Sequence, residues 1–234
     1  MGSNKPAARG PVLFAASLLT ALALTACAPR PPRLVPPPGG VEAVEGFGSA
    51  SIAGAEASVK GKFGFAFRRP GLGRVEAVDP IGRTAFLIIF REGRAWFVLP
   101  GRKAYAEDAA GLMMERFLGV ALEPDEATLL LSGTWKAGAP PGPGQGEEAW
   151  LLDRDAEGRV VRGARGELSF AVKSFFPGDG VPREITLLGA DASGRVKVLK
   201  IALDPAPRDA AFDVAFLSRY AMKTWDELLE LLER

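Results

Sequence analysis

The sequence has no histidine and only one cysteine among its 234 residues. Without histidine, the chain cannot form a Ser-His-Asp or Cys-His catalytic site, and it lacks the ligand that most catalytic zinc sites use. A single cysteine cannot form an internal disulfide, and no CxxC pair is present to hold a metal or carry redox chemistry. These absences exclude most common hydrolases, and we expect no enzyme activity, no metal and no cofactor.

The chain also lacks an excess of charge of either sign. It contains 29 Lys and Arg against 28 Asp and Glu, and two of the basic residues, Lys5 and Arg9, fall within the leader predicted below. Nucleic-acid binding requires a clustered basic excess, so we expect no nucleic-acid partner. Hydrophobic residues make up 47% of the chain and charged residues 24%, which is typical of a globular protein of this size with one domain.

The start of the chain has the features of a secretory signal peptide. Lys5 and Arg9 are followed by an almost entirely apolar stretch over residues 11–24. This stretch is shorter than the roughly 20 apolar residues that a membrane-spanning helix needs. We therefore predict that residues 1–26 form a signal peptide.

The residues that follow directly, Leu24, Thr25, Ala26 and Cys27, resemble the lipobox of bacterial lipoproteins. The resemblance implies cleavage before Cys27, a diacylglycerol on its thiol and a further acyl chain, such as palmitate, on its amino group. Several acyl chains anchor a protein stably, whereas a single chain binds a membrane only marginally. An ordinary signal peptide with a chance cysteine, and an uncleaved span, are the alternatives.

Residues 27–43 are predicted to tether the domain to this anchor. The stretch 28–40 is rich in proline, which favours an extended, semi-rigid chain. Ala28 follows the cysteine, whereas the usual signal for inner-membrane retention in such lipoproteins is Asp. We therefore expect an outer-membrane protein that faces the periplasm.

Strands dominate the rest of the chain. In Val59–Phe67, apolar residues alternate with lysines and small residues, so that Phe63, Phe65 and Phe67 share one face. The same kind of pattern, bounded by turn residues, predicts further strands at Arg74–Val78, Thr84–Phe90, Ala95–Leu99, Ala149–Asp153, Arg159–Gly163, Glu167–Phe175, Arg183–Leu188 and Arg195–Leu203, with Ala211–Phe216 as one more candidate.

Helices are predicted at three places. Asp108–Leu118 and Pro124–Leu131 interrupt the sheet, and Gly133 stands where the second helix would be capped. The segment 137–148 is rich in proline and glycine and is predicted to be a loop. Thr224–Glu227 has the pattern of a capping box, which indicates that residues 221–234 contain an amphipathic helix.

The predicted fold is mainly β with helices, an α+β fold in which both faces of the sheet must be covered. Several strands, such as Thr84–Phe90, are apolar on both faces. A layer of helices with a second sheet opposite would cover both faces, and so would a curved sheet around a lipid-sized apolar cavity. Periodicity alone does not separate a filled core from an open cavity.

No arrangement of carboxylates in the sequence predicts a metal or catalytic site. The segment Asp153–Gly158 has the acidic spacing of a calcium loop, but its twelfth position, where a bidentate Glu is needed, is Ala164. We therefore interpret it as a hairpin turn. The acidic residues around the two central helices are interpreted as a solvated face, because nothing pairs them across a cleft; they are Glu115, Glu123, Asp125 and Glu126.

The stretch Gly73–Thr84 contains the pattern R-x-x-x-x-x-P-[LI]-G-x-[ST] and resembles the LolB family of outer-membrane lipoprotein receptors, within the LolA/LolB-like lipoprotein localisation proteins. The resemblance continues through Tyr105–Ala109 and Leu118–Leu122 and covers about Gly46–Trp135. The chain departs from the family in the Pro/Gly-rich insertion after Trp135 and in its C-terminal helix, so it resembles a divergent member.

The resemblance implies an incomplete antiparallel β-barrel closed by short helices, spanning residues 44–220. It further implies a protein that takes acylated lipoproteins or other lipid from a periplasmic LolA-like carrier and inserts them into the outer membrane. In the turn Pro80-Ile81-Gly82, the isoleucine occupies the place where the family exposes an apolar residue to the bilayer. A side chain folded back onto the domain is the alternative for Ile81.

We predict that a cavity for acyl chains is lined by residues of the aromatic strands and closed by a helix that acts as a lid. The strand residues are Phe63, Phe65, Phe67, Phe86, Ile88, Trp96 and Val98, and the lid residues are Leu112, Met113 and Phe117. The protein is expected to act as a monomer. The alternative function is an envelope scaffold that has a filled core and binds a protein partner through the 137–148 loop.

Overall fold

The structure is a computed structural model, and it describes residues 40–53, 58–118, 121–135, 149–178 and 180–233. The predicted signal peptide, the lipobox residues Leu24, Thr25 and Ala26, the anchor Cys27 and the Pro-rich stretch lie outside the described residues. The predicted loop 137–148 does so as well. The predictions for these segments therefore stay predictions.

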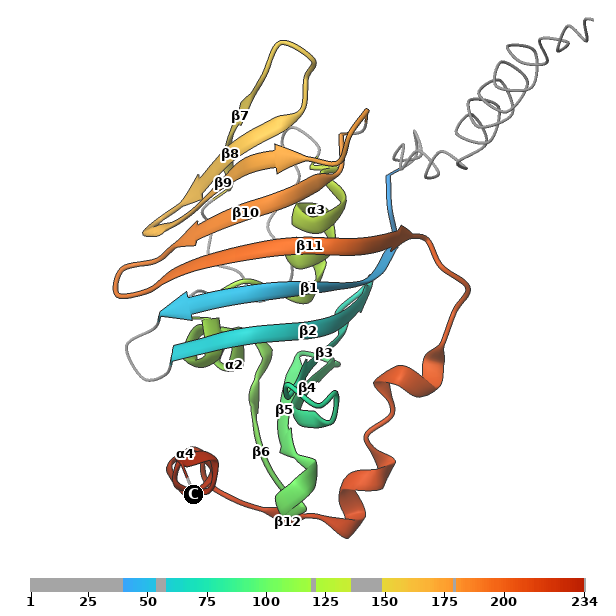
Figure 1. The fold of residues 1–234 in the computed structure, drawn as a ribbon, viewed down its shortest axis with the longest axis vertical. Coiled ribbons are helices and arrows are strands. Elements are labelled where there is room, and N and C mark those ends of the chain that lie inside the picture. Colours follow the sequence, from blue (N-terminus) through green and yellow to red (C-terminus); the bar gives the residue numbers. More distant parts are fainter. Residues whose placement is uncertain (1–39, 54–57, 119–120, 136–148, 179, 234) are drawn as a thin grey trace, which may run out of the picture. The chain divides into compact units, whose positions relative to one another are not determined.

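The described residues form one open sheet of twelve strands (Figure 1). Neighbouring strands are antiparallel except for β12, which runs parallel to β6, and the order across the sheet is β12-β6-β5-β4-β3-β2-β1-β11-β10-β9-β8-β7. The strands are β1 (Ala43–Ala53), β2 (Ser58–Arg68), β3 (Leu72–Val78), β4 (Thr84–Arg91), β5 (Arg94–Leu99), β6 (Ala104–Ala109), β7 (Leu151–Arg154), β8 (Val160–Arg165), β9 (Leu168–Phe175), β10 (Pro182–Leu188), β11 (Ser193–Leu203) and β12 (Ala221–Met222).

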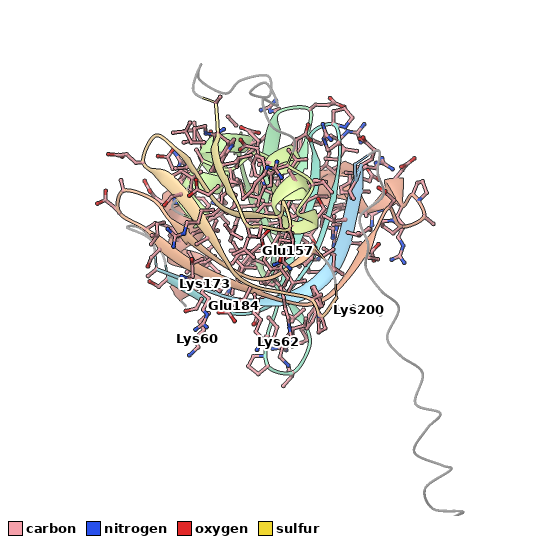
Figure 2. The ribbon with its side chains drawn as sticks, turned by 90° about the horizontal axis from the view of Figure 1, so that it is seen from above. Lys60, Lys62, Glu157, Lys173, Glu184 and Lys200 are labelled. Carbon is pink, nitrogen blue, oxygen red and sulfur yellow. The ribbon has the colours of Figure 1, made fainter. Side chains whose placement is uncertain are left out.

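The sheet is curved, and two helices lie on its concave side (Figure 2). These are α2 (Ala110–Leu118) and α3 (Pro124–Ser132), and a third helix, α4 (Trp225–Glu233), packs beside β6. Short 3-10 helices occur at η2 (Pro100–Arg102), η3 (Asp209–Phe212) and η4 (Ala215–Arg219). The predicted fold class is confirmed: the sheet is mainly antiparallel, it is not closed, and helices complete it.

Both faces of β4 and β5 are covered, as the sequence predicts for strands that are apolar on both sides. The main core lies on the concave face and includes the fully buried side chains of Ile88, Phe90 and Phe97. A smaller core on the convex face contains Leu87 and Ile89, which alternate with the first group along β4. No second sheet covers this smaller core within the described residues, because the segment 205–220 lies over it instead.

Three strands and one helical segment differ from the predictions. We did not predict β1, β6 and the short β12, and Ala211–Phe216 is not a strand but the region of η3 and η4. The sequence of β1 does not predict a strand because it consists mostly of small residues. Its two glycines in particular have a low strand propensity. It pairs over its whole length with β2 and β11, so the tertiary context overrides that propensity.

The predicted capping box at the start of α4 is present. The backbone N–H of Thr224 donates to the Glu227 carboxylate at 2.9 Å, and the N–H of Glu227 donates to the Thr224 hydroxyl at 3.3 Å. These bonds satisfy two backbone donors that the first turn of a helix leaves unpaired. Leu228 on the inner side of α4 is fully buried, so the helix is docked onto the domain.

Candidate functional site

The concave face of the sheet and the helices α2 and α3 surround an apolar cavity. Its volume is about 310 Å³, at the lower end of the usual range for small-molecule sites. The sheet side is lined by Phe63, Phe67, Val75, Ala77, Phe86, Ile185 and Val196, and the helix side by Met114, Leu122, Ala127, Leu130 and Leu131. Such a lining favours an apolar ligand.

Charged residues occur only where the cavity opens. Lys60 and Lys62 at the start of β2, and Asp79 and Pro80 just after β3, contribute to the lining. Both lysines and Pro80 are exposed to solvent, and Lys62 pairs with Val78 across the strands, so these residues lie at one end of the sheet. We call this end the mouth of the cavity.

The aromatic residues of β2 lie over glycines of the neighbouring strands. Phe65 is paired with Gly46, and Phe63 with Gly48. A Cβ added at Gly46 would come within 2.5 Å of the Phe65 ring, so only glycine leaves room for the ring there. The glycines that weaken the strand signal of β1 therefore allow the phenylalanines to pack against the sheet backbone.

Five of the predicted cavity residues face the concave side of the sheet, and two do not. Phe63, Phe67 and Phe86 line the cavity; Phe65 and Ile88 are buried in the same core. Trp96 and Val98 were placed wrongly, because they belong to the convex core with Leu87 and Ile89. In β5 the residue that points inward is Phe97, which stacks on Phe86 with ring centres 5.0 Å apart.

The helix predicted as a lid contributes a different methionine from the one expected. Met114 lines the cavity, whereas Met113 is fully buried in the core and Leu112 is 49% exposed. The side chain of Phe117 lies outside the described residues. The sequence could have predicted that Met114 is buried. Ala110, Met113 and Met114 follow the i, i+3, i+4 spacing of a buried helix face.

A buried ion pair fixes α3 over the cavity. Arg165 on β8 pairs with Glu126 on α3, and the two side chains are 13% and 6% exposed. The Trp150 indole also donates to Glu126 at 2.6 Å, and Arg165 donates to the Ala121 carbonyl oxygen at 2.9 Å. The cluster around the helices is thus partly buried and structural, which corrects the prediction that Glu126 belongs to a solvated face.

We expect Arg165→Ala to lower the free energy of unfolding by about 3–5 kcal/mol, because it leaves the Glu126 carboxylate buried without a counter-charge. Urea denaturation would measure this loss. Arg94→Ala is a suitable control, since the Arg94 side chain is 63% exposed in its pair with Glu107 and should cost at most about 1 kcal/mol. Equal effects of the two substitutions would contradict the structural role of the buried pair.

Burial raises the pKa of Glu123, and the neighbouring charge of Glu126 adds to this. A carboxyl with a raised pKa in the folded state contributes full stability below its unfolded pKa and loses it as the pH rises through the folded pKa. We therefore expect Glu123→Gln to be more stable than the parent at pH 7 and to lose this advantage below roughly pH 4. The amide oxygen can still accept the helix-capping bond.

Urea denaturation of both proteins across this pH range would measure the effect of Glu123→Gln. A stability difference that does not change with pH would contradict the assigned pKa shift. A destabilised variant at pH 7 would show that the capping geometry of Glu123 outweighs its charge.

The predicted membrane turn lies beside the mouth, and its isoleucine is exposed. Ile81 is 73% exposed, so the alternative of a side chain folded back onto the domain is not observed. The Asp79 carboxylate accepts from the backbone N–H groups of Ile81 at 3.0 Å and Arg83 at 2.9 Å. Gly82 has φ +83°, a conformation that favours glycine. The turn therefore holds Ile81 out into solvent.

Solved structures share the overall fold of this chain. An outer membrane lipoprotein-sorting protein domain from Vibrio parahaemolyticus aligns with a TM-score of 0.53 at 10% identity, over 76% of this chain and 92% of its own. A DUF1329 family protein from Desulfovibrio piger aligns with a TM-score of 0.53 at 11% identity, over 89% of this chain and all of its own. This chain has the fold of the lipoprotein-sorting domains. The fold that the resemblance to LolB implies is thereby confirmed.

Other comparisons add little to the fold assignment. A LolA superfamily protein from Nitrosomonas europaea aligns with a lower TM-score of 0.47 at 11% identity, over 78% of this chain and 94% of its own. No protein-family model matches the sequence, and no curated protein matches it significantly. The likeness to the lipoprotein-sorting fold is thus one of structure.

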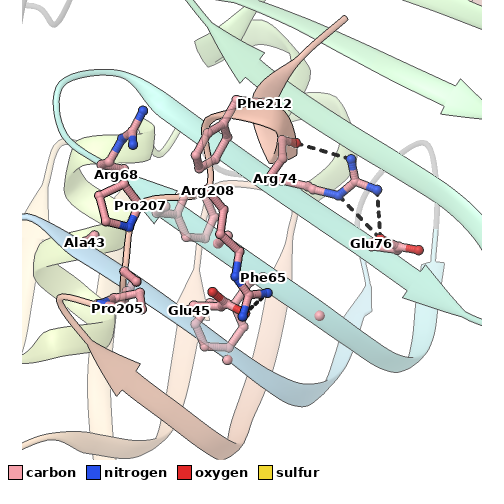
Figure 3. A pocket seen from close by; sticks show the side chains of 17 residues that line it. Ala43, Glu45, Phe65, Arg68, Arg74, Glu76, Pro205, Pro207, Arg208 and Phe212 are labelled. Carbon is pink, nitrogen blue, oxygen red and sulfur yellow. Dashed lines mark hydrogen bonds and ion pairs between the residues drawn. The ribbon is translucent and has the colours of Figure 1, made fainter. Parts of the chain in front are cut away.

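A second hollow lies on the convex side of the lipoprotein-sorting fold, between β1–β3 and the segment 205–212 (Figure 3). Its arginines are all paired: Arg208 with Glu45 at 3.1 Å, Arg74 with Glu76 at 2.9 Å, and Arg68 with Asp209 at 2.6 Å. Arg74 also donates to the Ala211 carbonyl oxygen at 3.2 Å. We interpret these contacts as a latch that holds the C-terminal segment on the sheet.

The described residues contain neither a group of metal ligands nor a membrane-spanning helix. Among them, no three Asp, Glu, Cys or His side chains are grouped so as to hold a metal ion. None of the helices within the described part of the chain has the length and apolar character needed to cross a membrane. The apolar lining of the cavity makes it the candidate site for an apolar ligand.

Proposed function

We propose that this chain is a lipid-anchored protein of the outer membrane that accepts the acyl chains of lipoproteins, or other lipid, in its cavity and passes them to the membrane. The observation that carries this proposal is an apolar cavity whose mouth lies next to an exposed isoleucine on a rigid turn. The anchor is Cys27, and the domain faces the periplasm. No covalent chemistry is required.

The cavity suits a hydrocarbon chain on energetic grounds. Each methylene moved from water into an apolar site contributes about 0.8 kcal/mol, so even part of one chain supplies useful affinity. Rings such as Phe63 and Phe86 and the flexible thioether of Met114 give a wall that tolerates ligands of varied shape. Lys60 and Lys62 at the mouth can remain in water beside the polar end of the ligand.

The position of Ile81 suggests how the ligand would leave. An isoleucine that enters the interfacial region of a bilayer brings the mouth, through Pro80, next to the acyl chains of the membrane. The ligand can then move from one apolar environment to another without crossing water. Its direction of transfer would be set by differences in affinity between a periplasmic LolA-like carrier, this cavity and the bilayer, with the receptor acting as a monomer.

Dye binding tests the proposal directly. The chain with Cys27→Ala, which carries no lipid of its own, should bind an environment-sensitive dye such as anilinonaphthalene sulfonate, and palmitate should displace it. Transfer of an acylated lipoprotein from its carrier to this chain should then follow. Dye binding that palmitate cannot displace, or an absence of dye binding, would overturn the acyl-chain function.

The envelope-scaffold alternative has one observation in its favour. The concave face is filled where α4 packs, because Trp225 lies edge-on against Phe97 with ring centres 5.3 Å apart and Leu228 is fully buried. The apolar cavity lies on another part of this face, under α2 and α3. A chain that binds no acyl chain but retains a protein partner would support the scaffold.

A further inference from the structure

The part of the convex sheet face that the segment 205–220 leaves uncovered carries a concentration of lysines. Seven lysines belong to the described residues, and five of them are exposed on strands β2, β9 and β11. We call this surface the lysine face; its lysines are Lys60, Lys62, Lys173, Lys197 and Lys200. Figure 2 shows Lys60, Lys62, Lys173 and Lys200 on the side of the curved sheet away from the helices.

The strand register explains how these charges come together. Ser49 on β1 pairs with Lys62 on one side and Lys197 on the other. In the next outward row, Ser51 pairs with Lys60 and with Arg195. The small serines leave the cations standing above the surface of the sheet, which here extends over five strands, or about 19 Å at the usual strand spacing.

The lysines of this face have no partners of their own in the described part of the chain, where none of the five forms an ion pair or a side-chain hydrogen bond. Glu184 lies opposite Lys197 in the register of β10 and β11, but its carboxylate pairs with Arg195. Asp153 on β7 lies opposite Arg162 on β8. The whole sequence is nearly neutral, so the five lysines concentrate positive charge on one face of the domain.

We infer that the lysine face binds the anionic headgroups of a phospholipid bilayer. Lysine is a flexible, strongly hydrated point charge, whereas specific protein contacts favour the planar fork of arginine and aromatic anchors. The described residues of this face include neither Trp nor Tyr. Lysine charge spread over an extended surface without such anchors matches a layer of lipid phosphates better than the binding site of a protein partner.

The lysine face also adjoins the mouth. Lys60 and Lys62 line the cavity opening together with Pro80, so a bilayer touched by Ile81 is within reach of these two lysines. The lysine face would orient the domain on the membrane before the turn inserts. This role does not depend on the cavity carrying lipid, and it stands or falls separately from the proposed function.

Vesicle sedimentation with the full chain carrying Cys27→Ala tests the inference. We expect binding to vesicles of phosphatidylcholine mixed with phosphatidylglycerol, little binding to pure phosphatidylcholine, and loss of binding at about 1 M salt, where charges are screened within about 3 Å. Lys62→Gln with Lys197→Gln should weaken the partition onto anionic vesicles about 25-fold, because each lysine near an anionic surface contributes a factor of about five.

The matched control removes two charges elsewhere. Lys103→Gln with Arg219→Gln changes two exposed cations outside the lysine face and should leave vesicle binding within about twofold of the parent. An equal loss in both double variants would show that only net charge matters and would overturn the inference. So would binding that ignores phosphatidylglycerol, or binding of an acidic protein such as polyglutamate in place of anionic vesicles.

Discussion

Ala77→Phe is expected to lower the affinity of the protein for palmitate by at least about tenfold. Ala77 lies on β3 between Phe63 of β2 and Phe86 of β4 in the register of the sheet, and all three residues line the cavity. A phenyl ring added there would occupy space that the ligand needs, at a loss of about 0.8 kcal/mol for each methylene displaced. Titration of the dye-loaded protein with palmitate would measure the effect.

The control for this substitution is Ala171→Phe on β9. Ala171 lies on the convex face, beside Lys173 and Ser169, and a ring there meets solvent and not the cavity. Palmitate affinity should be unchanged, and circular dichroism should show both variants folded. If the two variants bind palmitate equally well, the hollow described here is not the ligand site.

Ile81→Glu is expected to abolish delivery of a bound lipoprotein to membrane vesicles while leaving its uptake from the carrier intact. The side chain is 73% exposed, so the substitution should change the stability of the fold by no more than about 0.5 kcal/mol. A carboxylate on the turn opposes entry into the bilayer, because burying an unpaired charge in an apolar medium is costly. A transfer assay with radiolabelled or fluorescent lipoprotein would separate uptake from release.

Leu151→Glu provides the matched control for the turn. Leu151 on the edge strand β7 is 77% exposed, so the two substitutions make the same kind of change at a similarly exposed apolar site. Only Ile81→Glu should block delivery. Normal delivery by Ile81→Glu, or an equal defect in Leu151→Glu, would remove the turn from the mechanism.

Sequence periodicity predicted those parts of the fold whose two faces differ chemically. In β2 the alternation of phenylalanine with lysine or small residues assigns each side chain to a face, and the structure agrees. In β5, Trp96, Phe97 and Val98 are all apolar, so the sequence does not show which of them point to the concave face. Trp96 and Val98 were therefore assigned to the wrong side. A one-residue shift in a strand moves every side chain to the opposite face.

Other features could not be predicted because they depend on residues far apart in the chain. Arg165 and Glu126 are separated by 39 residues, and nothing local indicates that they pair. The lysine face likewise arises from strands β2, β9 and β11, each of which contributes only one or two lysines. Gly46 and Gly48 reduce the local tendency of β1 to form a strand, although they are what the rings of β2 require.

The two edges of the sheet differ in their ability to accept another strand. At β6, the backbone oxygens of Lys103 and Tyr105 accept bonds at 2.8 Å from Ala221 and Lys223, and α4 packs beside the same strand. Covered edges of this kind resist the strand-to-strand association that leads proteins to aggregate or exchange segments. Association of domains by strand pairing would therefore begin at β7, the strand at the other edge. β7 has only four residues, so it offers few backbone hydrogen bonds to an added strand.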